Sequence, residues 1–153
     1  MCAVPVDNNI YVMKEIPFQD SSSLSKVQQE KQNMKSLSHR NICSYVDSFI
    51  AQGNKLFLIM EYCDRGDLEQ YLTRVKTMNA TILKGPGTSV TAATMFELGE
   101  SKVWRFFLQI CLALETIHDK GIVHADLKPS NLLMSGRDYI IKLTDFGVSS
   151  SEI

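Results

Sequence analysis

The sequence predicts an α+β fold, with strands early in the chain and long helices after them. Residues 10–16 follow a turn-like Asp-Asn-Asn and are rich in β-branched and aromatic side chains, as expected for a strand. Residues 56–60 are apolar throughout, which is typical of an internal strand. Residues 98–118 form a longer apolar-rich segment with helical spacing. A second hairpin is predicted at residues 132–143, after the helices.

The composition of the chain is that of an ordinary globular domain. It has 153 residues, of which 44% are hydrophobic and 22% charged, and its formal net charge is −1. This charge provides no overall attraction to nucleic acid or anionic lipid, and no apolar stretch approaches the ~20 residues of a membrane helix. We therefore expect no nucleic-acid partner and no membrane partner, and the oligomeric state is unknown from the sequence.

The cysteines and the first residues of the chain give an expectation for the cellular compartment of the protein. Cys2, Cys43, Cys63 and Cys111 lie far apart and form no C-x-x-C pair. The opening segment lacks the basic start and long apolar run of a signal peptide. We therefore expect a reducing, intracellular (cytoplasmic) location.

One face of the predicted strand 10–16 carries a lysine among apolar side chains. Alternation with a period of two places Lys14 on the same face as Ile10, Val12 and Ile16. The simpler interpretation is that the lysine stem covers apolar surface while its ammonium group reaches water at the strand end. The other interpretation is that the ammonium group has a partner inside the fold.

The predicted helix 24–37 carries a carboxylate inside its apolar stripe. Val27, Glu30, Met34 and Leu37 recur at helical spacing along one face. Because a buried charge without a partner costs several kcal/mol, Glu30 must either reach water or meet a cation. Lys14 is the candidate for that cation.

The middle of the chain is predicted to contain a hairpin and two helices. Residues 45–50 and 56–60 flank a Gly53-Asn54 turn, and the second strand is expected to be central. Asp67 is expected to cap the next helix, with Gln70 completing a capping-box pattern. Periodicity then stops between residues 77 and 96, which predicts a flexible insert. The insert is a surface loop without a role or, alternatively, a phosphorylation or docking segment.

The second helix, residues 98–118, is expected to be largely buried because its apolar side chains extend around most of its circumference. Gly121 suits the left-handed residue that stops such a helix. The stripe and its flanks consist of Val103, Trp104, Phe106, Phe107, Leu108, Ile110, Cys111, Leu112, Leu114 and Ile117.

A polar loop between two apolar segments contains most of the candidate functional residues. The segment 122–133 places Asp126, Lys128 and Asn131 at fixed offsets after His124, and Asp145-Phe146-Gly147 begins fourteen residues past Asn131. A hairpin over residues 132–143 would bring Asp145 back toward the loop. Each residue alone is weak evidence, since most loop carboxylates are solvated and have no function. The string His-x-Asp-x-Lys-x-x-Asn followed by Asp-Phe-Gly is specific.

These motifs resemble the catalytic loop and the metal-binding triplet of eukaryotic protein kinases. The Lys128-Pro129-Ser130 segment is more similar to serine/threonine kinases than to tyrosine kinases. The amino-acid sequences of residues 11–16, 60–63, 66–68 and 109–114 are similar to those of NIMA-related kinases.

The resemblance implies a role for each site residue. Asp126 would accept the proton of the substrate hydroxyl, Lys128 would steady the transferred phosphoryl group, and Lys14, paired with Glu30, would hold the phosphates of ATP. His124 would pack and hydrogen-bond structurally. The implied cofactors are ATP and Mg²⁺, and the implied partner is a protein substrate. The implied metal ligands are Asn131 and Asp145, and the implied adenine neighbours are Met60, Glu61, Cys63 and Leu133, although Cys63 alone is more simply explained as a small buried hydrophobe.

The resemblance also divides the chain into parts of a kinase domain. Residues 1–60 correspond to a partial small lobe with no G-x-G-x-x-G before Lys14, residues 61–66 to the hinge, and residues 67–153, including the insert 77–96, to the start of the large lobe.

Two departures from the kinase pattern affect the expected activity. Ala125 replaces the usual arginine of the catalytic loop, and the sequence ends before an activation segment. We therefore expect residues 1–153 alone to transfer phosphate poorly and to leave the apolar face of 103–117 partly uncovered. The alternatives are a non-catalytic pseudokinase or interaction module, or a chain without a stable fold.

Overall fold

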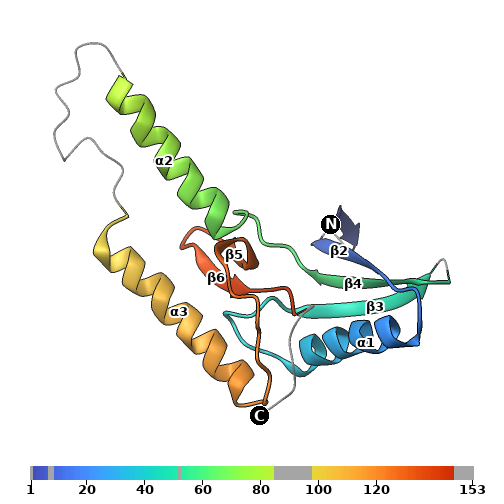
Figure 1. The fold of residues 1–153 in the computed structure, drawn as a ribbon. Coiled ribbons are helices and arrows are strands. Elements are labelled where there is room, and N and C mark those ends of the chain that lie inside the picture. Colours follow the sequence, from blue (N-terminus) through green and yellow to red (C-terminus); the bar gives the residue numbers. More distant parts are fainter. Residues whose placement is uncertain (1, 7–8, 52, 85–97, 147–153) are drawn as a thin grey trace.

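The computed structural model describes residues 2–6, 9–51, 53–84 and 98–146. Figure 1 shows two parts, a sheet with one helix along its side and a pair of long helices with a short hairpin beside them. The polypeptide passes from the sheet to the second part after strand β4, Lys55–Glu61. The segment that precedes strand β3, Tyr45–Ala51, also contacts the second part, where Ile42 bridges Leu143. The α+β class expected from the sequence describes this arrangement.

The larger sheet is antiparallel, and its four strands lie in the order β1-β2-β4-β3. The expected central position of β4 is confirmed, because it pairs with β2 on one side and β3 on the other. The edge strand β1 was not expected; it contains Pro5, which an edge strand tolerates because its outward backbone needs no donor. The bounds are Cys2–Val6 for β1, Asn9–Pro17 for β2, Tyr45–Ala51 for β3 and Lys55–Glu61 for β4.

Helix α1, Ser21–Ser36, begins three residues earlier than the apolar spacing suggested. The Asp20 side chain accepts a hydrogen bond from the backbone N–H of Ser23 at 2.7 Å, and the Ser23 hydroxyl oxygen accepts one from the backbone N–H of Asp20. This reciprocal cap satisfies two donors at the start of the helix. The predicted stripe is confirmed, since Val27, Glu30, Met34 and Leu37 are all buried.

Helix α2, Leu68–Lys84, begins at the predicted cap, where the backbone N–H of Gln70 donates to the Asp67 carboxylate at 2.8 Å. The expected break at Thr77 is wrong for residues 77–84, because the helix continues through them. Apolar spacing is lost there, but backbone hydrogen bonding and residues with good helix propensity sustain the helix without it. The remainder of the predicted insert, residues 85–96, lies outside the described residues.

Helix α3, Glu100–His118, has the predicted extent, and Gly121 adopts the expected left-handed conformation with φ of +67°. Its expected overall burial is wrong, since only Phe106, Ala113 and Ile117 are buried. The expectation that the apolar face of residues 103–117 is partly uncovered is confirmed. The helix is covered where it meets β6 and the Tyr71 ring of α2, which packs edge-on against Phe106. In the described part of the chain, no helix is long and apolar enough to cross a membrane. The exposed apolar side chains of α3 are Val103, Trp104, Phe107, Leu108 and Leu112.

Strands β5, Leu132–Ser135, and β6, Ile140–Leu143, form the predicted second hairpin. Single bridges join Ile42 to Leu143 and Asp67 to Leu133, so the hairpin contacts the segment before β3 and the start of α2. Buried Asn41 reinforces the first junction, because its amide donates to the Ile141 carbonyl at 2.9 Å and to the Gln109 side chain at 3.0 Å. One continuous hydrophobic core therefore extends from α1 and β4 to α3 and the hairpin.

Replacing Ile117 with alanine tests the core under α3. Ile117 is fully buried, so we expect Ile117→Ala to lower the free energy of unfolding by about 3 kcal/mol, as is usual for large-to-small core substitutions. The matched control is Leu108→Ala on the same helix, where the side chain is 59% exposed and the expected loss is below about 0.5 kcal/mol. Urea denaturation followed by circular dichroism measures both, and equal losses would contradict this packing.

Candidate active site

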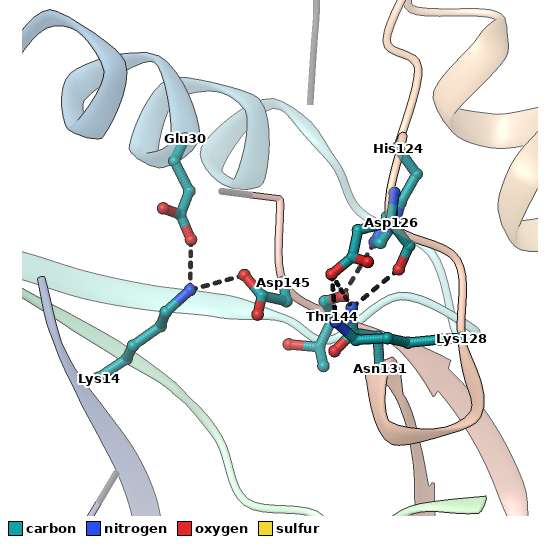
Figure 2. A network of polar contacts seen from close by, with 8 residues as sticks. All are labelled: Lys14, Glu30, His124, Asp126, Lys128, Asn131, Thr144 and Asp145. Carbon is teal, nitrogen blue, oxygen red and sulfur yellow. Dashed lines mark hydrogen bonds and ion pairs between the residues drawn. The ribbon is translucent and has the colours of Figure 1, made fainter. Parts of the chain in front are cut away.

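The ammonium group of Lys14 lies between two carboxylates from distant parts of the chain. Its Nζ is 2.7 Å from Oε1 of Glu30 and 2.8 Å from Oδ1 of Asp145. Figure 2 shows Lys14 reaching from β2 toward Glu30 on α1 and Asp145 just after β6. The Glu30 side chain is 5% exposed, so its charge is compensated mainly by Lys14. Lys14 therefore has an internal partner, as the second interpretation of its position required.

These contacts also shift the titration of the lysine. Burial by itself would lower the pKa of Lys14, but the hydrogen bonds to Asp145 and Glu30 and the charges of both carboxylates outweigh it. The pKa of Lys14 is consequently raised above its ordinary value of 10.5. The lysine is thus held as a cation at neutral pH.

The loop after His124 gathers three of the predicted residues. Lys128 Nζ is 2.6 Å from Oδ2 of Asp126, and the Asn131 amide donates to both the backbone carbonyl and Oδ2 of Asp126 at 2.9 Å. A single 3₁₀ turn, Pro129–Asn131, closes the loop and returns Asn131 toward Asp126. The hydrogen bond from Lys128, followed by that from Asn131, lowers the pKa of Asp126. Asp126 is therefore ionised well below neutral pH.

Backbone contacts tie this loop to the end of β6. The backbone N–H of Thr144 donates to the Asn131 carbonyl at 3.0 Å, and buried His124 contacts the Thr144 carbonyl through Nε2 at 2.9 Å. The other ring nitrogen of His124 accepts from the backbone N–H of Asp126 at 3.3 Å, and the Phe146 ring packs edge-on against the imidazole. The predicted structural role of His124 is confirmed. Because Asp145 lies between Thr144 and Phe146, the same contacts position its carboxylate.

Two residues of the site have left-handed backbone conformations without being glycine. Ala125 has φ of +60° and Asp145 has φ of +69°. Aspartate tolerates this region better than most residues, whereas alanine does not, so the surrounding contacts must stabilise both conformations. Ala125 directly precedes Asp126, and Asp145 carries its own carboxylate, so both left-handed turns affect where these two carboxylates lie. The hydrogen bond to Asp126 raises the pKa of Lys128, and the charge of Asp145 adds a smaller contribution, which indicates that Lys128 and Asp145 are near one another.

The predicted adenine neighbours lie where β4 leads into α2. Met60 is buried, and the bridge between Asp67 and Leu133 places Leu133 beside this connection. The backbone N–H of Glu61 already donates to the Ser44 carbonyl at 3.0 Å. Cys63 is buried, as the simpler interpretation expected. The contacts of these four residues with adenine remain predictions.

A cavity of about 570 Å³ lies elsewhere, between α2, α3 and the β5–β6 hairpin. Tyr71, Lys102 and Tyr139 line it, and none of the predicted site residues does. It therefore contributes nothing to the case for a nucleotide site around Lys14 and Asp126.

The family model described as "protein kinase domain" matches residues 1–152 of this chain. The chain belongs to the protein kinase family. The resemblance inferred from the motifs at Asp126, Asn131 and Asp145 is thereby confirmed.

Individual relatives identify the branch of the family. The serine/threonine-protein kinase nekl-2 of Caenorhabditis elegans is 34% identical over 125 residues, which cover 82% of this chain and 32% of the relative. The serine/threonine-protein kinase Nek8 of Danio rerio is 32% identical over 151 residues, covering 97% and 19%, respectively. The serine/threonine-protein kinase Nek5 of Homo sapiens is 32% identical over 145 residues, which cover 94% of this chain and 18% of the relative. The chain thus spans about a third or less of these Nek (NIMA-related) kinases.

The structure also shows contacts in this kinase chain that the sequence did not indicate. The Lys14–Asp145 ion pair joins residues 131 positions apart, and Asp145 had been assigned only to a metal. Thr144 contacts Asn131 and His124 through its backbone, so its side-chain type gave no signal for this role. The left-handed Ala125 had no sequence signal either, because glycine is the residue expected at such a position.

Replacing Glu30 with glutamine tests the ion pair with Lys14. The substitution keeps the size of the side chain but removes a buried charge, so we expect Glu30→Gln to lower the free energy of unfolding by about 2 kcal/mol. The matched control is Glu15→Gln, at the position next to Lys14 on strand β2. Glu15 pairs with Lys55 at 2.7 Å but is 48% exposed, and its loss should cost less than about 1 kcal/mol. A larger loss of stability for Glu15→Gln than for Glu30→Gln would contradict a stabilising ion pair between Lys14 and Glu30.

The raised pKa of Lys14 predicts a pH dependence of stability. A group whose folded-state pKa is raised contributes stability below its unfolded pKa and loses it as pH rises through the folded-state pKa. The difference in free energy of unfolding between the unmodified chain and Lys14→Met should therefore be constant from neutral pH to about 10.5 and shrink above it. Denaturant titrations over this pH range measure the difference. If the difference in free energy of unfolding instead decreased as the pH is lowered from neutral, the prediction would be contradicted.

Proposed function

We propose that this chain carries the nucleotide-binding and catalytic centre of a serine/threonine protein kinase, which transfers the γ-phosphate of ATP to protein hydroxyl groups. The observation that carries the proposal is the bridging of Glu30 and Asp145 by Lys14. This bridging of the strand lysine, the helix glutamate and the Asp-Phe-Gly aspartate supports the proposal, because phosphoryl transfer in this family depends on the lysine–glutamate pair and on the aspartate as a metal ligand. Family membership supports the reaction class, and the contacts support competence of the site.

The phosphates of ATP would lie at the Lys14 ammonium group. Glu30 orients the lysine and compensates its charge, while the carboxylate of Asp145 lies 2.8 Å from the same nitrogen. A cation held between two carboxylates is positioned before nucleotide arrives, so little side-chain entropy is lost on binding. Lys14 would then exchange part of its contact with Asp145 for phosphate oxygens.

The residues that would hold Mg²⁺ are Asn131 and Asp145. Both offer oxygen ligands, which this hard cation prefers, and protein kinases generally use Mg²⁺ with ATP. The Asn131 amide nitrogen donates twice to Asp126, which fixes the amide plane and turns its oxygen away from Asp126. The metal would neutralise phosphate charge as the γ-phosphoryl group leaves ADP.

Asp126 would orient the substrate hydroxyl and accept its proton. Its lowered pKa keeps the carboxylate ionised at neutral pH, and its side chain is 36% exposed, so a protein hydroxyl can approach it. Lys128, paired with Asp126, supplies a cation beside the transferred group. Positioning and charge compensation supply most of the catalysis in this reaction class.

Adenine would lie between the β4–α2 connection and Leu133. Because the Glu61 N–H is used by Ser44, Glu61 would contact adenine through its carbonyl oxygen, with Cys63 providing the next backbone group. Met60 would border the back of the site and Leu133 would pack against the base. A protein substrate and an intracellular setting are parts of the same proposal.

The alternative is a non-catalytic pseudokinase. Ala125 favours it, because the loop lacks the arginine that in most kinases pairs with a phosphorylated activation segment. The change removes a regulatory contact and leaves Asp126, Lys128 and Asn131 in place. Nucleotide binding without phosphate transfer would distinguish this alternative.

The proposal is tested by Asp126→Asn in the native protein that contains this chain, assayed with Mg-ATP and dephosphorylated casein. We expect phosphate transfer to fall at least about 100-fold, because the proton acceptor is lost while the loop geometry is largely kept. Asp138→Asn, on the exposed β5–β6 turn, is the matched control and should retain activity. An unaffected Asp126→Asn variant would refute the catalytic role.

Nucleotide binding provides a separate measurement. We expect Mg-ATP to raise the melting temperature of the unmodified protein, and Asp145→Asn to abolish most of the magnesium-dependent part of that rise. A rise without any phosphate transfer would support the pseudokinase. No rise with the unmodified protein would contradict the kinase proposal and would favour a non-catalytic module.

A further inference from the structure

Two thiols lie next to each other where β4 leads into α2. The sulfurs of Cys43 and Cys63 and a carboxylate oxygen of Glu61 all lie within 4.8 Å of one another. Cys43 is 1% exposed and Cys63 is 8% exposed, and both are reduced in this structure. The predicted kinase site uses the backbone of Cys63 and does not use either thiol.

The backbone keeps the two cysteines adjacent. Tyr45 pairs with Met60 at the end of the β3–β4 ladder, and the Glu61 N–H extends the ladder by donating to the Ser44 carbonyl at 3.0 Å. The Cys43 N–H is held by the Leu143 carbonyl at 2.9 Å. The segments that carry the two thiols therefore run side by side, although the cysteines are separated by 19 residues in the sequence.

We propose that Cys43 and Cys63 are an oxidation site, at which a peroxide converts the two thiols into an intramolecular disulfide. The sulfurs lie within 4.8 Å of one another, so forming a bond of about 2.05 Å requires side-chain rotation together with a shift of the backbone. The Glu61 carboxylate is already engaged, because its Oε1 accepts from Lys142 at 2.8 Å and from the Ser44 N–H at 2.8 Å. A divalent cation would have to compete with Lys142 for that oxygen, so oxidation is favoured over metal binding.

The two thiols are not equivalent, which assigns an order to the reaction. The adjacent Cys43 thiol, followed by the charge of Lys142, lowers the pKa of Cys63 in spite of its burial and of the charge of Glu61. The hydrogen bond with Cys63 and then burial raise the pKa of Cys43. Cys63 is also the more exposed of the two. Cys63 is therefore the nucleophile, and Cys43 is the resolving thiol.

The chemistry balances with hydrogen peroxide as the oxidant. The Cys63 thiolate attacks one peroxide oxygen, the O–O bond breaks, and the second oxygen leaves as hydroxide, which takes up a proton to form water. The sulfur of Cys43 then attacks the Cys63 sulfenic acid, the S–O bond breaks, and the oxygen leaves with the proton of Cys43 as a second water. In sum, two thiols and one peroxide give one disulfide and two water molecules.

The disulfide would tie the β4–α2 connection to the segment before β3. This consequence depends on the proposed function, because the backbone near Cys63 is the expected partner of adenine. Drawing the Cys63 sulfur to bonding distance of Cys43, about 2.05 Å, displaces that backbone. Oxidation should therefore weaken nucleotide binding.

The test uses the full chain with Cys2→Ser and Cys111→Ser, so that the pair under test supplies the only thiols. The reduced protein is treated with hydrogen peroxide, alkylated, digested with trypsin and analysed by mass spectrometry without reduction. We expect a cross-linked product of the tryptic peptides 41–55 and 56–65 that has lost two hydrogen atoms and disappears on reduction.

Single substitutions separate the two thiols. Cys43→Ser should abolish the cross-link and leave a Cys63 sulfenic acid that dimedone traps, while Cys63→Ser should leave Cys43 as an unreacted thiol. Circular dichroism verifies that both variants are folded. A folded protein in which peroxide forms no cross-link, or in which Cys43 reacts equally well in the absence of the Cys63 thiol, would overturn the proposal.

Nucleotide binding is measured on the same samples before and after oxidation. We expect oxidation to reduce the Mg-ATP-dependent rise in melting temperature by at least half. In the Cys43→Ser variant, which cannot form the disulfide, peroxide should leave this rise in melting temperature unchanged. The cross-link is detected without nucleotide, so failure of the thiol proposal and failure of the kinase proposal give different results. A cross-link with an undiminished Mg-ATP response would refute control of the site by oxidation.

Discussion

The interaction on which the rest of this structure depends is the ion-paired cluster of Lys14, Glu30 and Asp145. It joins a strand, a helix and the residue after the second hairpin, which are far apart along the chain. Glu30 is buried in the apolar stripe of α1, where an uncompensated charge would be strongly destabilising. The position of the helix against the sheet and the position of Asp145 are therefore coupled to one lysine.

A second group of contacts, mostly through the backbone, determines where the side chains of the candidate site lie. His124 and Asn131 bond to the backbone of Thr144, and the parallel bridge between Ile42 and Leu143 joins β6 to the segment before β3. Left-handed conformations at Ala125 and Asp145 then direct the chain at both sides of the site. The carboxylates of Asp126 and Asp145 are thus positioned by groups that take no part in the proposed chemistry.

The connection between β4 and α2 combines two kinds of chemistry in a short segment. Its backbone is the expected site of adenine, while the Cys63 thiol lies beside Cys43 and within the influence of Lys142. Both depend on the register of β3 with β4, since that register brings the two segments together. A change in the pairing of these strands would alter the nucleotide site and the thiol pair at the same time.

Sequence reasoning indicated most of the candidate site residues because its signals are local. The helical spacing of Val27, Glu30 and Met34 predicted the buried face of α1, and the spacing from Asp126 to Asn131 indicated a loop with a family-specific function. The same reasoning failed where partners decide the outcome. Strand β1 contains Pro5 and forms by pairing with β2, and α3 is partly exposed because burial depends on what covers a helix.

The sequence by itself determined the order of most elements and the face of α1 that is buried, and it indicated the candidate site residues, because periodicity and short motifs involve near neighbours. Only the tertiary structure decided that Lys14 contacts Asp145 and that Cys43 lies beside Cys63. Those contacts depend on strand register and on the return path of the second hairpin. Neither is encoded in the spacing of the residues that meet.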